Sequence, residues 1–206
     1  SGALMQLNFS TLEPLDRYRW LASTITPRPI AWVSSLSADG ISNLAPFSFF
    51  TVISDDPATL LINVNHRGDG SLKDTLLNVQ ASGELVIQLV SFEQAEAMNA
   101  SAALLPHAIS EFEHCGIASL PSVQVKPPRV AGAAVALECR LVEAMPYPKA
   151  APNCHLLFAE VLLAHIDERV LNEQGRIDAG KLDLIGRLGG AAYSRTTERF
   201  DLKRPS

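Results

Sequence analysis

The succession of segments in this chain predicts a mainly β fold: an antiparallel β-barrel with peripheral helices. Stretches rich in β-branched and aromatic residues follow one another, and few helical stretches lie between them. A doubly wound parallel sheet would need a helix after nearly every strand. The 206 residues contain no evident linker, so we predict a single domain over 1–206, with 1–14 as an N-terminal extension whose residues 1–3 resemble a cloning scar.

Each predicted element has a local reason. Strands are assigned where apolar residues alternate or run together between turn-forming residues, and helices where apolar residues recur at helical spacing. The strands are residues 30–36, a partner returning from residue 41, 58–64, 84–90, 129–144 and 155–167. The helices are residues 14–23, 72–81 and 93–104.

Pro46 marks a special place in the strand that returns from residue 41. Proline has no backbone N–H, so the ladder is either broken there or lies at an edge of the sheet. Backbone groups at this point would then be available to a ligand.

The predicted helix 72–81 begins at a motif that could also bind an anion. Ser71-x-x-Asp74 has the form of a capping box, and Gly83 ends the element. A helix N-terminus offers free N–H groups and a partial positive charge, to which Lys73 and Thr75 add a cation and a hydroxyl donor. These features suit a phosphate monoester; the alternative is that both side chains only decorate an exposed first turn.

Composition argues against several classes of protein. The net charge of −5 and the pI near 5.5 disfavour a nucleic-acid partner. The apolar runs 130–137 and 156–164 are too short for a membrane-spanning helix, and the first residues lack a signal-peptide pattern, so we expect a cytoplasmic protein. The three cysteines form no Cys-x-x-Cys pair and are expected to be reduced, with Cys139 in the core.

Two other kinds of site receive little support. The chain contains no Rossmann fingerprint, no NTPase phosphate loop and no serine-hydrolase elbow. His107, Glu111 and His114 are close enough in sequence to evoke a metal site, but they match no zinc signature. We favour the alternative of surface histidines and predict no metal.

Four motifs, taken in order, resemble the flavin reductase-like, FMN-binding split-barrel family. They are TPRPIAWVS at 26–34, NLAPFSFF at 43–50, KDT at 73–75, and RLGG at 187–190 with Tyr193. The resemblance runs from about residue 15 to the end, and only the combination of motifs is specific. It implies a Greek-key split barrel, a homodimer, and FMN held non-covalently near the subunit interface.

The resemblance also implies which residues contact FMN. Lys73 and Thr75 match positions near the phosphate, whereas residues 43–48 match positions along the ring and the ribityl chain. The expected contacts are Arg28, Pro29, Ser34, Asn43, Leu44, Ala45, Pro46, Ser48, Asn63, Arg67, Lys73, Asp74, Thr75, Gly190 and Tyr193. For each of them the alternative is a turn or packing role, which burial would explain best for Ala45 and Pro46.

The function that the resemblance implies is an oxidoreductase in which NADH or NADPH reduces FMN. The flavin then passes electrons to free flavin, oxygen or a protein acceptor. His155 matches a histidine that lies near the nicotinamide in some relatives, although a histidine packed in a strand is the alternative; Arg195 reaches either the cofactor or the partner subunit. Two other functions stay open: a flavoredoxin-like electron carrier, and a structural or ligand-sensing barrel.

Overall fold

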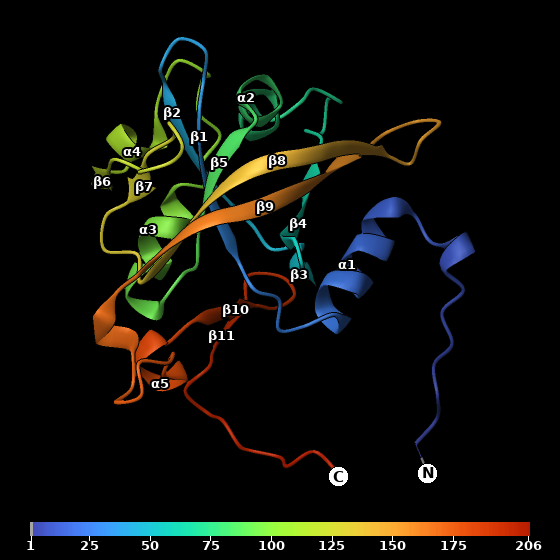
Figure 1. Cartoon of the computed structure of the whole chain (residues 1–206). Coiled ribbons are helices and arrows are strands. Elements are labelled where there is room, and N and C mark those ends of the chain that lie inside the picture. The colour runs from blue at the N-terminus through green and yellow to red at the C-terminus, as the bar shows by residue number, and fades with distance from the viewer. Residues whose placement is uncertain (1) are drawn as a thin grey trace.

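The computed structural model describes residues 2–206 and confirms a mainly β chain built around one large antiparallel sheet (Figure 1). Its strands are β1 (Ala31–Leu36), β2 (Ser42–Phe47), β3 (Phe50–Asp55), β4 (Ala58–Asn65), β5 (Glu84–Gln88), β8 (Val135–Tyr147) and β9 (Cys154–Ile166). They are ordered β2-β1-β5-β8-β9-β4-β3, and every pairing is antiparallel. Within residues 2–206 no ladder joins the edge strands β2 and β3, so backbone pairing does not close the predicted barrel.

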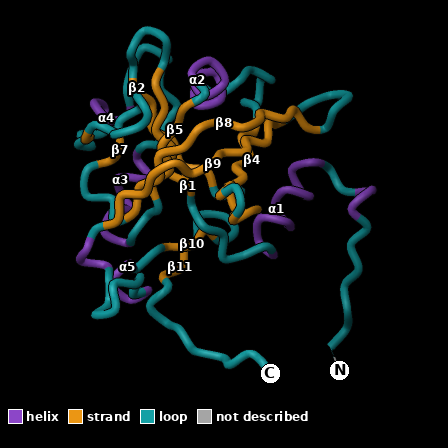
Figure 2. The backbone as a smooth tube through the Cα atoms, viewed as in Figure 1, coloured by secondary structure: helices purple, strands orange, loops and turns teal. Residues whose placement is uncertain are grey.

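Short elements surround this sheet, as the tube view shows (Figure 2). The helices are α1 (Pro14–Thr24), α2 (Asp74–Ser82), α3 (Ala95–Ala100), α4 (Glu111–His114) and α5 (Ala179–Leu182), with 3-10 turns at Phe9–Thr11, Phe92–Gln94 and Glu168–Val170. Two small ladders pair β6 (Ser119–Leu120) with β7 (Arg129–Val130), and β10 (Ile185–Arg187) with β11 (Tyr193–Arg195). None of the helices in residues 2–206 has the length and apolar character that crossing a bilayer requires.

Side chains on the two faces of the sheet form two separate clusters, because successive strand residues point to opposite faces. Val33 packs on one face with Leu76 of α2, whereas Trp32 packs on the other with Met98 of α3. Trp32 also donates from Nε1 to Ser101 Oγ at 2.9 Å. Cys139 lies in the first cluster as predicted, where burial raises the pKa of its thiol to about 12.

The predicted capping box at Ser71 is wrong. The backbone N–H and the hydroxyl of Ser71 both donate to Asp69 Oδ1, at 2.9 and 2.6 Å, and this local turn replaces the cap. Helix α2 begins at Asp74, and the N-terminal flanking residue is Lys73, whose side chain makes no capping bond. The predicted helix 93–104 is also shorter, since α3 covers only Ala95–Ala100.

Of the two alternatives for Pro46, a broken ladder or an edge strand, the structure confirms the edge strand, because β2 lies at the edge of the sheet. Leu44 donates its N–H to the Glu111 carboxylate at 3.0 Å, away from β1. Backbone N atoms two residues apart point to the same side of a strand, so the ring nitrogen of Pro46 also faces away from β1. The proline therefore interrupts no bond to β1.

Candidate functional site

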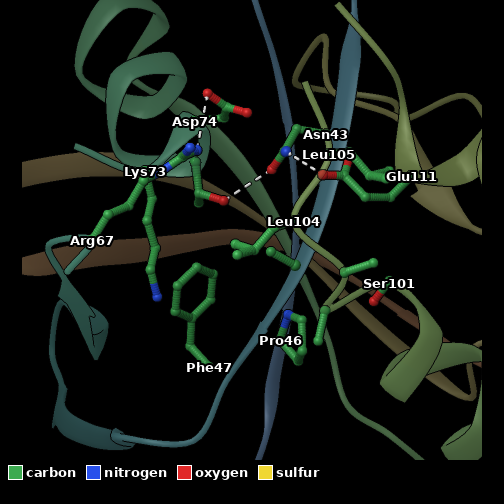
Figure 3. A pocket seen from close by; sticks show the side chains of 14 residues that line it. Asn43, Pro46, Phe47, Arg67, Lys73, Asp74, Ser101, Leu104, Leu105 and Glu111 are labelled. Atoms are coloured by element: carbon green, nitrogen blue, oxygen red, sulfur yellow. Dashed lines mark hydrogen bonds and ion pairs between the residues drawn. The ribbon is translucent and has the colours of Figure 1, made fainter. Parts of the chain in front are cut away.

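A cavity lies between β2, the start of α2 and the segment 101–105, and we call it the cationic cavity (Figure 3). Its lining residues are Asn43, Ala45, Pro46, Phe47, Arg67, Lys73, Asp74, Thr75, Ser101, Ala102, Ala103, Leu104, Leu105 and Glu111. Seven of the residues expected from the sequence are thereby gathered in one place: Asn43, Ala45, Pro46, Arg67, Lys73, Asp74 and Thr75.

The two cations of this cavity lack sufficient anionic partners. Over the described part of the chain, Lys73 makes no side-chain hydrogen bond or ion pair; its Nζ lies 5.5 Å from the centre of the Phe47 ring. Burial, and then the charge of Arg67, lower the pKa of Lys73. Arg67 Nη2 lies 3.5 Å from Asp74 Oδ1, but its Nε is buried without a partner. Such an arrangement is costly unless an anion enters.

The start of α2 adds backbone donors to these cations. The first N–H groups of a helix have no partner within the helix, and the aligned peptide dipoles place a partial positive charge there. Since Lys73 supplies no side-chain cap, these groups remain available to a bound anion.

A buried network joins three residues of the cavity. Thr75 donates its hydroxyl to Asn43 Oδ1 at 2.9 Å, and Asn43 Nδ2 donates to Glu111 Oε1 at 2.8 Å. Burial raises the pKa of Glu111. A threonine hydroxyl has one proton, and Asn43 takes it, so Thr75 presents only lone pairs to the cavity in this arrangement.

A second, apolar cavity lies beside the first along the chain. It is lined by Leu21, Ile25, Arg28, Ser48, Phe49, Phe50, Thr51, Leu61 and Asn63. Phe47 lines the cationic cavity and Ser48 lines the apolar one, so the end of β2 separates the two. The predicted residues Arg28, Ser48 and Asn63 therefore belong to the apolar cavity.

Arg28 is buried, and its guanidinium is already occupied by the chain itself. Nη1 donates to the carbonyls of Ala22 at 2.6 Å and Ile25 at 2.8 Å, and Nη2 donates to Leu188 at 3.3 Å. Nε reaches Ser48 Oγ at 3.4 Å. Arg28 thus fixes the end of α1 against the edge of the apolar cavity.

The C-terminal motif, residues 187–190 with Tyr193, packs against Arg28 and the end of α1. Arg187 pairs its backbone with that of Arg28, donates to the Gly190 carbonyl at 2.6 Å and stacks 4.5 Å from the Tyr193 ring centre. A Cβ on Gly189 would lie 2.9 Å from Ser23 Cα, so the motif packs tightly on the end of α1. Gly190 and Tyr193 line neither of the two cavities.

Other predicted residues also lie outside both cavities. Pro29 and Leu44 line neither, and the buried Ser34 donates its hydroxyl to the Pro128 carbonyl. Arg195 pairs with Asp183 at 2.6 Å and stacks on Phe92.

His155 pairs with another histidine. His155 Nδ1 lies 2.9 Å from His66 Nε2, and burial, with the charge of His66, lowers the pKa of His155. The pair lies outside both cavities. A neutral ring hydrogen-bonded to its neighbour agrees with the alternative of a packed histidine.

The sequence does not predict that Glu111 and the segment 101–105 line the cavity. Glu111 was considered only as a metal ligand beside His107 and His114, yet it binds Asn43, whereas His107 Nδ1 lies 2.9 Å from Asp74 Oδ1. Asn43 and Glu111 are far apart in sequence, and no local spacing connects them. Alanines and leucines such as those at 102–105 carry no binding signal at all.

Comparison with known proteins now defines the class. A family model described as flavin reductase like domain matches residues 23–181. The match covers most of the chain, and the chain belongs to this family.

Three solved structures are similar to the whole chain. Component B of nitrilotriacetate monooxygenase from Bacillus cereus is 33% identical, with a TM-score of 0.93 and coverage of 98% of this chain and 100% of that one. The 2-nitrobenzoate 2-nitroreductase NbaA from Pseudomonas fluorescens is 31% identical, with a TM-score of 0.88 and coverage of 98% and 97%. A split barrel domain protein from Shewanella frigidimarina NCIMB 400 is 18% identical, with a TM-score of 0.82 and coverage of 95% and 96%, which supports the fold alone.

Proposed function

We propose that this protein is an NAD(P)H-dependent flavin reductase that holds FMN non-covalently. One observation carries the choice of FMN: among residues 2–206 Lys73 has no anionic partner, and Arg67 shares Asp74 with His107, beside the start of α2. A phosphate monoester would supply the missing negative charge and would accept from the backbone N–H groups. Riboflavin has no such group, so the cavity favours the phosphorylated flavin.

The residues present fit the two ends of FMN. Arg67, Lys73 and the first turn of α2 would hold the phosphate. The apolar cavity offers Phe49 and Leu61 as walls, with Asn63 as a polar group, which is the lining that a planar ring with a polar edge requires. When bound there, the flavin supplies the electron-accepting chemistry.

The chain's own part in the reaction is to bind and orient rather than to transfer a proton. Hydride transfer between two stacked rings depends on position. His155 is bound to His66, so we assign it no acid or base role. Nicotinamide binding would then rest on ring stacking and scattered polar contacts, and be transient.

Rapid-mixing spectroscopy tests this function. Bound FMN should lose its absorbance within one mixing experiment with NADH or NADPH under anaerobic conditions, and His155→Ala should change the rate by less than the roughly hundredfold loss expected for a general acid. If dithionite bleaches the flavin and neither nucleotide does, the reductase function is wrong. The flavoredoxin-like electron carrier, which needs the same cavities, would take its place.

We also propose a homodimer that delivers electrons to a protein acceptor. Apolar side chains remain exposed on several elements, among them Ile25 at the end of α1 (63%), Val52 on β3 (67%) and Val142 on β8 (59%). A second copy would cover them. Light scattering should give twice the 22.2 kDa chain mass.

The printed name of the Bacillus cereus relative, a monooxygenase component, supports a protein acceptor.

A further inference from the structure

We propose that the segment 102–107, tied to α2 by His107 and Asp74, makes the cationic cavity selective for a flavin mononucleotide over a flavin dinucleotide. This inference rests on the proposed flavin site. It concerns which flavin enters the site, and it assigns the discrimination to particular residues.

The segment is anchored at both ends and tied once between them. Ser101 accepts from Trp32 Nε1 at 2.9 Å and donates to the Met98 carbonyl at 2.6 Å, whereas Ser110 Oγ lies 2.8 Å from Ser42 Oγ. Residues 102–109 are Ala, Ala, Leu, Leu, Pro, His, Ala and Ile, so His107 is their one polar side chain. Its contact with Asp74 is therefore the side-chain hydrogen bond that fixes the middle of the segment to α2.

This contact ties α2 to the segment whose residues 101–105 line another part of the cavity. Residues 101–105 line one wall and residues 73–75 line another (Figure 3). Asp74 Oδ1 lies 2.9 Å from His107 Nδ1, and its side chain is only 15% exposed. His107 does not itself line the cavity; its contact holds the segment against α2 beside the Asp74 carboxylate, which does line it.

The charges at this end favour one phosphate and oppose a second. Arg67 and Lys73 face the cavity, and two cations match one phosphate dianion. The carboxylate of Asp74 stands at the tied end, where it would repel a further phosphate. A dinucleotide also has to place a second phosphate and an adenosine near the first phosphate, where the Asp74 carboxylate opposes the second negative charge and the tied segment limits the space.

Equilibrium titration of the purified protein with FMN, FAD and riboflavin tests the inference. Wild type should bind FMN at least about tenfold more tightly than FAD. Because a partly exposed ion pair contributes little, His107→Ala should lower the FMN-to-FAD affinity ratio by about twofold to fivefold, chiefly by improving FAD binding. His107→Arg, which supplies another hydrogen-bond donor for Asp74, should retain the ratio.

His114→Ala is the matched control, because His114 is also an exposed histidine but its side chain makes no hydrogen bond or ion pair with Asp74 among residues 2–206. It should leave the ratio unchanged, and thermal unfolding should show that all three variants fold. If wild type binds FMN and FAD equally, or if His107→Ala leaves the ratio unchanged, the inference is overturned while the flavin site stands. If the protein binds none of the three flavins, the proposed function itself fails, and the inference fails with it.

Discussion

The hydroxyl of Thr75 donates to the side-chain oxygen of Asn43 across 2.9 Å, and this bond joins the first turn of α2 to the edge strand β2. Both residues were expected to contact the cofactor directly. Direct contact with the cofactor stays a prediction for both; in the structure they bond to each other, and Glu111 fixes the orientation of the Asn43 amide. A pair of this kind shapes the cavity before any ligand enters it.

Replacing Thr75 by valine should destabilise the fold more than it weakens FMN binding. The substitution keeps the shape but leaves the buried Asn43 oxygen without a donor, which costs about 1–3 kcal/mol. Urea denaturation should show this loss, whereas Thr197→Val, at an exposed threonine, should change little. A dissociation constant for FMN that rises far beyond about tenfold would show that the hydroxyl turns to the ligand instead.

Replacing Lys73 by methionine should weaken FMN binding specifically. The loss of one charged hydrogen bond to phosphate, about 1.5–3 kcal/mol, corresponds to about 10- to 150-fold in affinity. Riboflavin, which has no phosphate, should bind the variant and wild type alike. Isothermal titration with both flavins measures the difference, and Lys149→Met, at an exposed lysine outside the cavity, serves as the control. Equal weakening of both flavins would place Lys73 away from the phosphate.

Stability should fall in acid because of Glu138 on β8. Its buried carboxylate accepts from the N–H groups of Val123, Gln124 and Val125 and pairs with His165. Burial raises the pKa of Glu138, but these hydrogen bonds outweigh it and bring the pKa below the ordinary 4.5. The folded state therefore binds this proton less readily than the unfolded state. The resulting stability is complete above pH 4.5 and is lost as the pH falls from there through the lowered folded value.

Glu138→Gln tests this pH dependence. At neutral pH the variant should lose about 3 kcal/mol, since His165 and three N–H groups lose their anion. The difference from wild type should shrink as the pH falls below 4.5. Glu143→Gln, at an exposed site on the same strand, should match wild type throughout. A constant difference across the acid range would contradict the assignment to Glu138.

Replacing Gly189 by alanine should destabilise the packing of the C-terminal motif against α1. The added methyl group would overlap Ser23, and overpacking of this kind costs about 1–3 kcal/mol. Thermal unfolding should show a lower midpoint for this variant. Gly68→Ala adds a methyl group into open space and should leave the midpoint near that of wild type. Equal midpoints would mean that the motif does not hold α1.

The sequence predicted the strands well because their signals are local. Alternating apolar residues bounded by turns identify β1, β4, β5 and β9 to within a few residues, whereas the predicted strand 129–144 also takes in β7 and begins six residues before β8. The start of α2 was placed too early because Asp69 competes for Ser71, a contact that a capping motif does not reveal. Backbone pairing that closes the barrel was likewise expected and is not seen between β2 and β3.

The candidate site was predicted where it depends on a contiguous motif and missed where it depends on distant contacts. Residues 73–75 at the start of α2, and Asn43 with residues 45–48 along and just after β2, line the cavities because each group is contiguous or nearly so in the chain. The partners of Glu111 and His107 lie 68 and 33 residues away along the chain. The C-terminal motif shows the converse: its residues are recognisable in sequence, but they contact Arg28 and line neither the cationic cavity nor the apolar one.

The edge of β2 has a consequence for solubility. An edge strand with free N–H groups can pair with another chain and begin aggregation. Here Glu111 occupies the N–H of Leu44, and Pro46 has none to offer, so two successive outward positions are closed to strand addition. Glu111 and Pro46 also line the cationic cavity. The surface left open for a small ligand is thereby denied to a neighbouring polypeptide.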